Sequence, residues 1–345
     1  MYDLQCYLDD LESRIDEKQE EIIWDDWKIF ADGKSVTAPF VATARTPVPP
    51  KIVWPNITIN QAINDNTLML ISQFKNCSDM LNSHSANVMS VRANYGVGII
   101  PSMFGAEPFV MSEEANTLPN VRNVSRTRLQ QIIDSPLPSF ENGFGNKVLS
   151  MGNAFSEIRK KYPKIARWIR VDHPDAQGPM DICELLWGSE LFLDLYDEPE
   201  LVHALLKKIT EFYKEFLDEW FRIVPPVDGY HTYFGRIHKG TIMVRSDSAM
   251  NMAPDFYKEF ILPYDSNVLT HFRGGAIHFC GRGEHFIELL STTPYLYAVD
   301  QSQPQLNNMD LILSNTIDKG INLFSNKNTF LPEDMKDHNI KLLSL

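Results

Sequence analysis

Short apolar runs alternate with longer amphipathic segments through the second half of the chain. The amphipathic segments predict helices, the clearest of which follows Pro199, where Leu205, Ile209, Phe212 and Phe216 step by three or four residues. Another helix is expected to begin at Pro254, because proline is favoured at the first helical position. The apolar runs predict strands at 168–172, 227–233, 241–246, 275–280, 295–299 and 321–325.

The first half is organised differently. Leu4, Leu8, Leu11 and Ile15 recur at helical spacing with acidic residues between them, which predicts an amphipathic N-terminal helix. Residues 46–50 read Thr-Pro-Val-Pro-Pro and predict an extended connector. Residues 58–82 show a helical pattern, and 88–92 read as a buried strand. We therefore divide the chain into an N-terminal arm and connector, 1–57, and a main body, 58–345.

Repeated strand–helix–strand alternation predicts a parallel sheet, either open and doubly wound or closed into an eight-stranded barrel. The doubly wound class usually carries a glycine-rich phosphate loop after its first strand. Neither GxGxxG nor GxxxxGK[ST] occurs in this sequence. We therefore expect an α/β fold of the (β/α)8 TIM-barrel type with an N-terminal helical extension.

Composition narrows the functional classes. The 345 residues are 43% hydrophobic and 22% charged, as in globular proteins that bury a large core. A net charge of −13 argues against binding to a nucleic-acid backbone, which needs clustered cations. There is no basic segment followed by an apolar one at the start, nor any run of about 18 apolar residues. Four widely spaced cysteines form no CxxC pair, which favours reduced thiols, so we expect a cytoplasmic protein that binds neither nucleic acid nor membrane.

Polar residues follow the predicted strands, where barrel enzymes place their chemistry, so we expect them to converge at one rim. Arg245 and Asp247 either pair with each other or contact a substrate, and His173 and His231 are either structural or ligating. Tyr230 and Tyr233 are either packing residues or catalytic phenols. The set comprises Arg92, Asn94, Asp172, His173, Asp175, His231, Arg245, Asp247, His278, Cys280 and Asp300.

His278 and Cys280 stand two residues apart on one predicted strand, so their side chains share a face. A thiolate with a neutral imidazole suits zinc better than magnesium or calcium. The alternative is a core histidine beside a buried free cysteine. A zinc site also needs further ligands from elsewhere in the fold.

Several segments together resemble the uroporphyrinogen decarboxylase superfamily, over roughly residues 86–330. The segments that carry the resemblance are Asp175–Pro179, Glu184–Gly188, Asp194–His203, Ser246–Ser248, Ala253–Tyr257, Phe260–Tyr264 and Ile277–Gly281. The resemblance implies a barrel of eight parallel strands and an enzyme acting on a small molecule. It also implies that the barrel of this chain has a shortened C-terminal end.

One branch of the superfamily contains corrinoid and coenzyme M methyltransferases, which activate a thiol on zinc held by His, Cys and a later Cys. His278 and Cys280 match the first two ligands, but no cysteine follows Cys280. Either the third ligand is an oxygen or nitrogen donor such as Asp300, Glu284 or His285, or the barrel binds no zinc. We take a corrinoid-linked methyltransferase that activates a thiol or other small substrate, with the corrinoid on a partner protein, as the leading hypothesis. Its expected substrate-binding residues are Arg92, Asn94, Gln177, Tyr230, His231 and Arg245.

The other branch decarboxylates uroporphyrinogen without a cofactor, and Asp247 or Asp172 would then stabilise the cationic pyrrole that develops. That branch grips its substrate with an arginine-rich N-terminal loop, whereas Arg45 is the only arginine in the proline-flanked region of this chain. A third reading is a non-catalytic binding protein on a degenerate barrel. The oligomeric state is left open, with a homodimer as the candidate.

Overall fold

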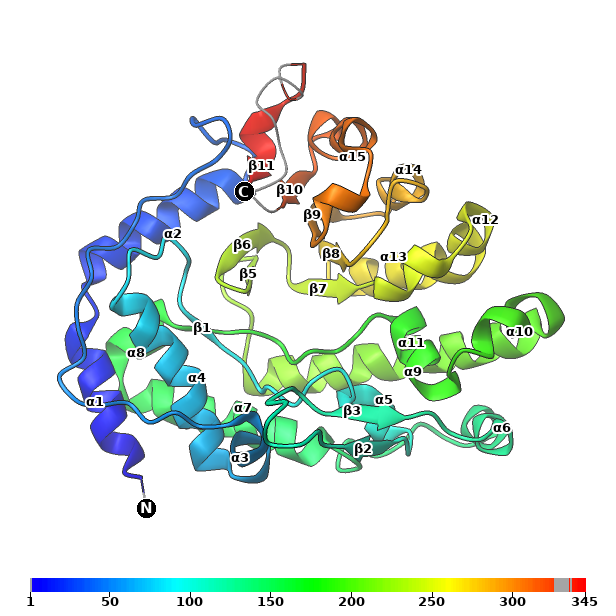
Figure 1. Cartoon of the computed structure of the whole chain (residues 1–345), viewed down its shortest axis with the longest axis horizontal. Coiled ribbons are helices and arrows are strands. Elements are labelled where there is room, and N and C mark those ends of the chain that lie inside the picture. The colour runs from blue at the N-terminus through cyan, green and yellow to red at the C-terminus, as the bar shows by residue number, and fades with distance from the viewer. Residues whose placement is uncertain (1, 326–334, 336) are drawn as a thin grey trace.

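The computed structural model describes residues 2–325, 335 and 337–345 and has an α/β fold with parallel sheets (Figure 1). Strands gather towards the middle of the molecule and helices lie around them. The strands are β1 (Ser90–Val91), β2 (Glu107–Phe109), β3 (Asn120–Arg122), β4 (Arg170–Val171), β5 (Tyr230–Tyr233), β6 (Arg236–Lys239), β7 (Ile242–Arg245), β8 (Gly275–Phe279), β9 (Leu296–Gln301), β10 (Asn322–Phe324) and β11 (Leu343–Ser344).

The helices confirm the amphipathic segments expected from the sequence. The predicted helix after Pro199 is the longest, and the helix expected at Pro254 continues through a π-helical turn into α13. They are α1 (Leu4–Arg14), α2 (Glu17–Ala31), α3 (Ile59–Asn64), α4 (Asn66–Leu81), α5 (Ile99–Met103), α6 (Arg126–Asp134), α7 (Gly145–Lys161), α8 (Pro163–Trp168), α9 (Pro179–Trp187), α10 (Leu191–Asp197), α11 (Pro199–Ile223), α12 (Pro254–Phe256), α13 (Leu262–His271), α14 (Ile287–Leu290) and α15 (Met309–Asn315).

Five strands form one parallel sheet in the order β11-β10-β9-β8-β7, and β1 pairs with β4 in a second parallel sheet. Two antiparallel hairpins, β2–β3 and β5–β6, complete the sheets of the described residues. Parallel strands joined through helices are the arrangement that the alternating sequence pattern predicts.

Each of the six predicted apolar runs contains a strand, but the run at 227–233 does not enter a parallel sheet. It forms β5, which pairs antiparallel with β6. Phe234 and Gly235 connect the two strands with φ angles of 47° and 76°. A two-residue turn with both residues in the left-handed region closes a hairpin, so no crossover helix follows this strand.

Side chains alternate across the five-stranded sheet. Met243 on β7, Ala276 on β8 and Ala298 on β9 are neighbours in register and share one buried cluster with Ile237 of β6 and Trp27 of α2. Two alanines in this layer leave space for the hairpin and α2 against the inner face of the sheet. The intervening residues belong to the larger core on the helix-covered side; they are Val244, Ile277, Val299 and Leu323.

A buried ion pair inside the N-terminal arm is joined to the main body through its arginine. Arg45 is 1% exposed; its Nε donates to Oε1 of Glu20 at 2.6 Å, and its Nη2 donates to Oε2. Nη1 of Arg45 also donates to the backbone oxygens of Ser85 and Asn87. The ion pair therefore joins α2 to the connector, and the Nη1 hydrogen bonds of Arg45 hold both against the segment that leads into β1. Removing one partner would leave a buried charge unpaired.

None of the helices in the described part of the chain combines the length and the apolar character that crossing a bilayer requires.

Candidate metal centre

Strand register brings three predicted site residues together. Arg245, His278 and Asp300 are Cα partners across β7, β8 and β9. Each stands two residues beyond Met243, Ala276 and Ala298, so the side chains lie on the same inner face of the sheet. Neighbouring strands are about 4.8 Å apart, which makes these side chains direct neighbours.

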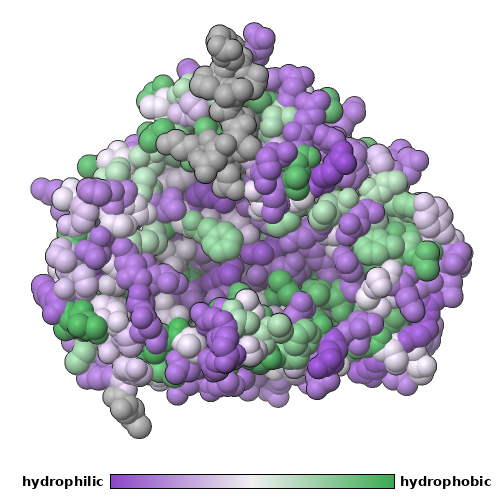
Figure 2. All heavy atoms as spheres, in the orientation of Figure 1, coloured by the Kyte–Doolittle hydropathy of each residue, from purple (hydrophilic) through white to green (hydrophobic). Residues whose placement is uncertain are grey.

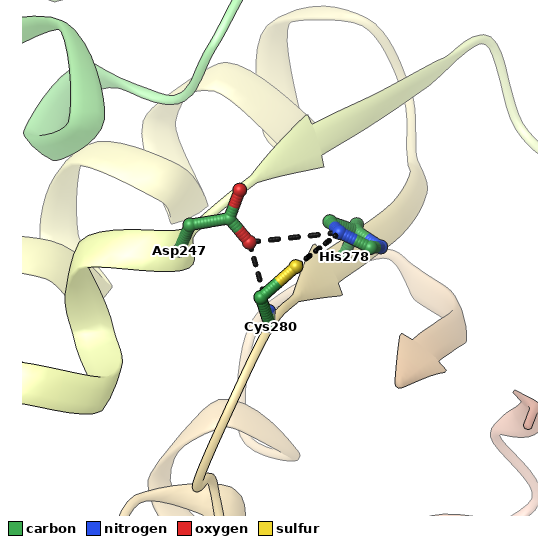
Figure 3. Close-up of side chains that lie close together, drawn as sticks. All are labelled: Asp247, His278 and Cys280. Atoms are coloured by element: carbon green, nitrogen blue, oxygen red, sulfur yellow. Dashed lines mark hydrogen bonds and ion pairs between the residues drawn. The ribbon is translucent and has the colours of Figure 1, made fainter. Parts of the chain in front are cut away.

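His278, Cys280 and Asp247 form a compact cluster at the ends of β7 and β8 (Figure 3). Nε2 of His278 lies 3.5 Å from Oδ1 of Asp247 and 3.4 Å from Sγ of Cys280. One ligand atom from each residue lies within 4.8 Å of the other two. The described residues contain no other group of three such side chains at this spacing.

The donor set fits zinc. Zinc binds nitrogen and oxygen at about 2.0–2.2 Å and sulfur at about 2.3 Å in a tetrahedron, which places two ligand atoms about 3.4–3.6 Å apart. The distances from His278 Nε2 to the other two ligand atoms, 3.4 and 3.5 Å, match this spacing. One nitrogen, one sulfur and one carboxylate oxygen make three protein ligands and leave a fourth position for a substrate.

Asp300 lies behind the imidazole, away from the cluster. The Nδ1 atom of His278 donates to Oδ2 of Asp300 at 2.6 Å, and Nη2 of Arg236 donates to Oδ1 at 2.8 Å. This carboxylate therefore orients the ring and leaves Nε2 for a metal, as carboxylate–histidine pairs do in zinc proteins. Asp300, expected as the third ligand, occupies this orienting position, and Asp247, expected as a catalytic residue, supplies the oxygen of the cluster.

The same contacts set the charge of the two partners. Burial acts to lower the pKa of His278, but the hydrogen bonds to Asp300 and Cys280 and the charges of Asp300 and Asp247 together outweigh it and raise the pKa to about 10. Burial likewise acts to raise the pKa of Asp300, but the Arg236 guanidinium and the His278 imidazole hold it below its ordinary value. A cation at Nε2, whether a proton or a metal ion, is therefore stabilised by this arrangement.

Local backbone contacts aim Asp247 and Cys280 at each other. Asp247 is the first residue of a 3-10 helix, and the N–H groups of Asp247 and Ser248 donate to the carboxylate of Asp181 at 3.0 and 2.8 Å. The N–H of Cys280 donates to Oδ1 of Asp247 at 2.8 Å. Gly281 then turns the chain with a φ of +76°, a conformation that favours glycine.

A pocket of about 340 Å³, which shares Arg245 with the strand pair that carries His278, receives most of the predicted substrate-binding residues. Its lining includes Arg92, Asn94, Asp172, His231 and Arg245. On the face shown in Figure 2, the molecule is hollowed near its centre, and hydrophilic residues dominate the walls. The predicted convergence of polar strand-end residues therefore holds for this group.

Asp175 organises the two arginines of the pocket. Nε of Arg245 lies 3.0 Å from Oδ1 of Asp175, and Nη1 of Arg92 lies 3.9 Å from Oδ2. Asn94 accepts from Nε of Arg92, and Gln177 donates to Asp175 at 2.7 Å. Arg245 pairs with Asp175 and not with Asp247, which leaves Asp247 for the metal cluster.

Two consecutive aromatic rings of the hairpin support these arginines. The Arg245 guanidinium lies 5.2 Å from the ring centroid of Tyr233, and that of Arg92 lies 5.1 Å from the ring of Phe234. The Tyr233 ring also lies 5.7 Å from the His278 ring, so it connects the pocket to the metal cluster. Stacking on an aromatic face leaves the edge of a guanidinium able to donate to an anion.

Asp172 and His173 have different roles in the pocket wall. Ser90 and Thr232 donate to Asp172, and burial raises the pKa of this carboxyl to about 7. Nε2 of His173 accepts from the Met243 N–H and its Nδ1 donates to the Pro174 oxygen, so both ring nitrogens are used structurally. His231 stacks on His173, and burial lowers its pKa well below the ordinary value.

The remaining candidates lie elsewhere. The Tyr230 hydroxyl donates to Asp32 of the N-terminal arm, outside the pocket. Gln177 and Asp247 line a neighbouring pocket of about 450 Å³. Glu284 pairs with Arg282, and neither Glu284 nor His285 joins the described metal cluster.

Arg236 and Phe234 are the site residues that sequence reasoning missed. Both belong to the β5–β6 hairpin, and the only local signal is Gly235 after an apolar run, which is compatible with a hairpin turn.

No family model matches this chain, and none of the curated proteins matches it either.

Proposed function

We propose that this protein is a zinc-dependent methyltransferase of the uroporphyrinogen decarboxylase superfamily that works with a separate corrinoid protein. The observation that carries the proposal is the Asp247–His278–Cys280 cluster with Asp300 hydrogen-bonded behind the imidazole. This combination of three ligands, an orienting carboxylate and an open fourth position is typical of catalytic zinc. A buried histidine beside an unrelated cysteine would not require an aspartate oxygen 3.5 Å from its Nε2 and a ligand atom of each residue within 4.8 Å of the other two.

Zinc in this position would supply a Lewis acid that lowers the pKa of a substrate thiol. The residues of the chain then have separate tasks. Asp247, His278 and Cys280 hold the metal, and Asp300 with Arg236 keeps the His278 proton on Nδ1. Arg92 and Arg245, fixed by Asp175 and by the hairpin aromatics, orient an anionic group of the substrate.

We also propose that the two parallel sheets are arcs of a single barrel. Two backbone hydrogen bonds support this closure. The Gly178 N–H donates to the Arg245 oxygen at 2.8 Å between the segment after β4 and the end of β7. The Phe40 N–H donates to the Leu343 oxygen at 2.8 Å, which adds the arm to the free edge at β11. Side chains of the β5–β6 hairpin and of α2 would then pack against the inner face of this barrel, with α2 itself outside the ring of strands.

The decarboxylase alternative has less support. Its substrate carries several carboxylates, and Arg45, the arginine of the proline-flanked region, is buried against Glu20 and cannot contact a substrate. The alternative of a non-catalytic binding protein is distinguished from the methyltransferase by the methyl-transfer assay described next.

Metal analysis and methyl transfer test the proposal together. The purified protein should hold about one zinc per chain, and Cys280→Ser should lose most of it, whereas Cys6→Ser, which changes an exposed thiol, should not. Incubation of the zinc-loaded protein with a methylated corrinoid and a small anionic thiol should demethylate the corrinoid, followed by its absorbance. Absence of stoichiometric zinc would refute the metal centre, and zinc without methyl transfer to any thiol would favour the binding-protein reading.

A further inference from the structure

A second cluster of positive charge lies in a crevice that the proposed reaction does not use. Arg170 is the first residue of β4 and Arg159 lies on α7, and both line the crevice. Trp24 of α2 forms another wall, with its ring centroid 3.8 Å from the Arg170 guanidinium carbon. The metal centre, by contrast, lies at the carboxyl ends of β7 and β8.

Neither arginine has a carboxylate partner. Among the residues that the structure describes, no aspartate or glutamate oxygen lies within 4 Å of Arg159 or Arg170. The Nε atoms of both side chains are buried and have no hydrogen-bond partner in that same part of the chain. A buried donor without an acceptor is costly, and two of them side by side in a chain with a net charge of −13 need an explanation.

The electrostatics agree with the geometry. Burial and then the charge of Arg159 lower the pKa of Arg170 to about 10, although Asp228 and Asp172 act on it in the opposite direction from a distance. Two guanidinium groups that repel each other in a partly buried crevice are stabilised by an anion placed between them.

We propose that this crevice binds a small oxyanion between Arg159 and Arg170. A guanidinium presents paired N–H groups that match two oxygens of one anion, which favours an oxyanion over a halide. The crevice has a volume of about 30 Å³, room for roughly two water molecules. That space takes the two oxygens by which a phosphate or a short carboxylate meets a guanidinium, so the rest of the anion would lie at the mouth of the crevice. It excludes a buried nucleotide or sugar phosphate.

The anion would join the N-terminal arm to the main body. Trp24 belongs to the arm, whereas Arg159 and Arg170 belong to α7 and β4. His231 lines both this crevice and the substrate pocket, so an anion here would also lie next to the pocket wall. Binding should therefore stabilise the folded protein by mass action.

Thermal unfolding and calorimetry with inorganic phosphate test the inference, with chloride exchanged for phosphate at constant ionic strength and no zinc added. Phosphate should raise the Tm of the wild-type protein to a plateau and bind with a stoichiometry of about one. Arg159→Gln and Arg170→Gln should each weaken binding roughly tenfold or more and remove the rise in Tm. A parallel titration with acetate separates a carboxylate site from a phosphate site.

Two variants serve as controls. Arg222→Gln changes an exposed arginine on α11 that, among the described residues, forms an ion pair with Glu219 alone, and it should leave phosphate binding unchanged. Arg245→Gln removes an arginine from the substrate pocket and should also leave it unchanged. Loss of binding in Arg245→Gln but not in Arg159→Gln would place the anion in the substrate pocket and overturn the inference. So would the absence of saturable binding of either anion to the wild-type protein, which decides the matter even if the arginine variants fail to fold.

Discussion

Asp300→Asn provides the sharpest test of the metal centre. Each oxygen of Asp300 accepts from a different donor, Nδ1 of His278 and Nη2 of Arg236. Asparagine offers one acceptor and one donor in their place. If its oxygen keeps Arg236, its NH₂ group faces Nδ1 of His278 and forces the proton onto Nε2, where it blocks a metal. If the amide takes the opposite orientation, its oxygen accepts from Nδ1 of His278, but its NH₂ group then faces the Nη2 donor of Arg236, and neither donor has an acceptor there.

Either orientation should weaken zinc binding by about 10- to 100-fold, or about 1.4–2.7 kcal/mol. Loss of the Asp300 charge also makes the proton on His278 easier to remove, which by itself favours the metal. That gain is the smaller effect, because a carboxylate stabilises a doubly charged zinc more strongly than a proton in the same position.

The assay is a zinc titration against a chelating dye at neutral pH, with far-UV circular dichroism to verify folding. Asp318→Asn is a matched control, since Asp318 accepts from His338 Nδ1 at 2.7 Å and lies outside the metal cluster. Zinc affinity of Asp300→Asn within about twofold of both wild type and this control would refute the orienting role.

Three further changes test the surroundings of the site. The folded protein keeps Asp172 protonated up to its pKa of about 7, which is above the ordinary value for aspartate. The contribution of this group to the free energy of unfolding is therefore present at pH 4 and is lost as the pH rises to 7. Asp172→Asn should remove about 4 kcal/mol of pH dependence over that window, measured by urea unfolding. Arg45→Met leaves the buried carboxylate of Glu20 without a partner and should lower the free energy of unfolding by about 3–5 kcal/mol. Adding Glu20→Gln should restore part of that loss. An unchanged urea midpoint in Arg45→Met would contradict the anchoring role. Gly281→Ala forces alanine to a φ of +76° with its Cβ 2.7 Å from the Met250 side chain. The free energy of unfolding should fall by about 1–2 kcal/mol, measured by urea unfolding. Zinc binding should weaken because Cys280 is displaced, measured by competition with a chelating dye.

The sequence predicts local structure well where one side of an element is buried along its whole length. The three-to-four-residue step from Leu205 to Ile223 predicts α11, and the apolar run at 275–280 predicts β8. It fails at 227–233, because the apolar pattern of a strand does not say whether the next strand lies beyond a helix or beyond a two-residue turn.

The sequence likewise predicts one part of the candidate site and not another. The pairing of His278 with Cys280 follows from the two-residue repeat of a strand, so sequence alone places both side chains on one face. The sequence also indicates that a third ligand comes from elsewhere in the fold, but nothing local distinguishes Asp247 from Asp300. Both aspartates follow or end buried strands, and both face the same histidine.

Only the tertiary structure decides their roles. Register sets Asp300 directly opposite His278 on the next strand, within reach of Nδ1, whereas the turn after β7 carries Asp247 to Nε2 and to the Cys280 N–H. The amino-acid sequence by itself determines most of the helices, the positions of the apolar strands and the chemistry of the donors, because these depend on neighbours along the chain. The assignment of ligand and orienting carboxylate depends on which strands pair and in which register, and the chain specifies that only by folding.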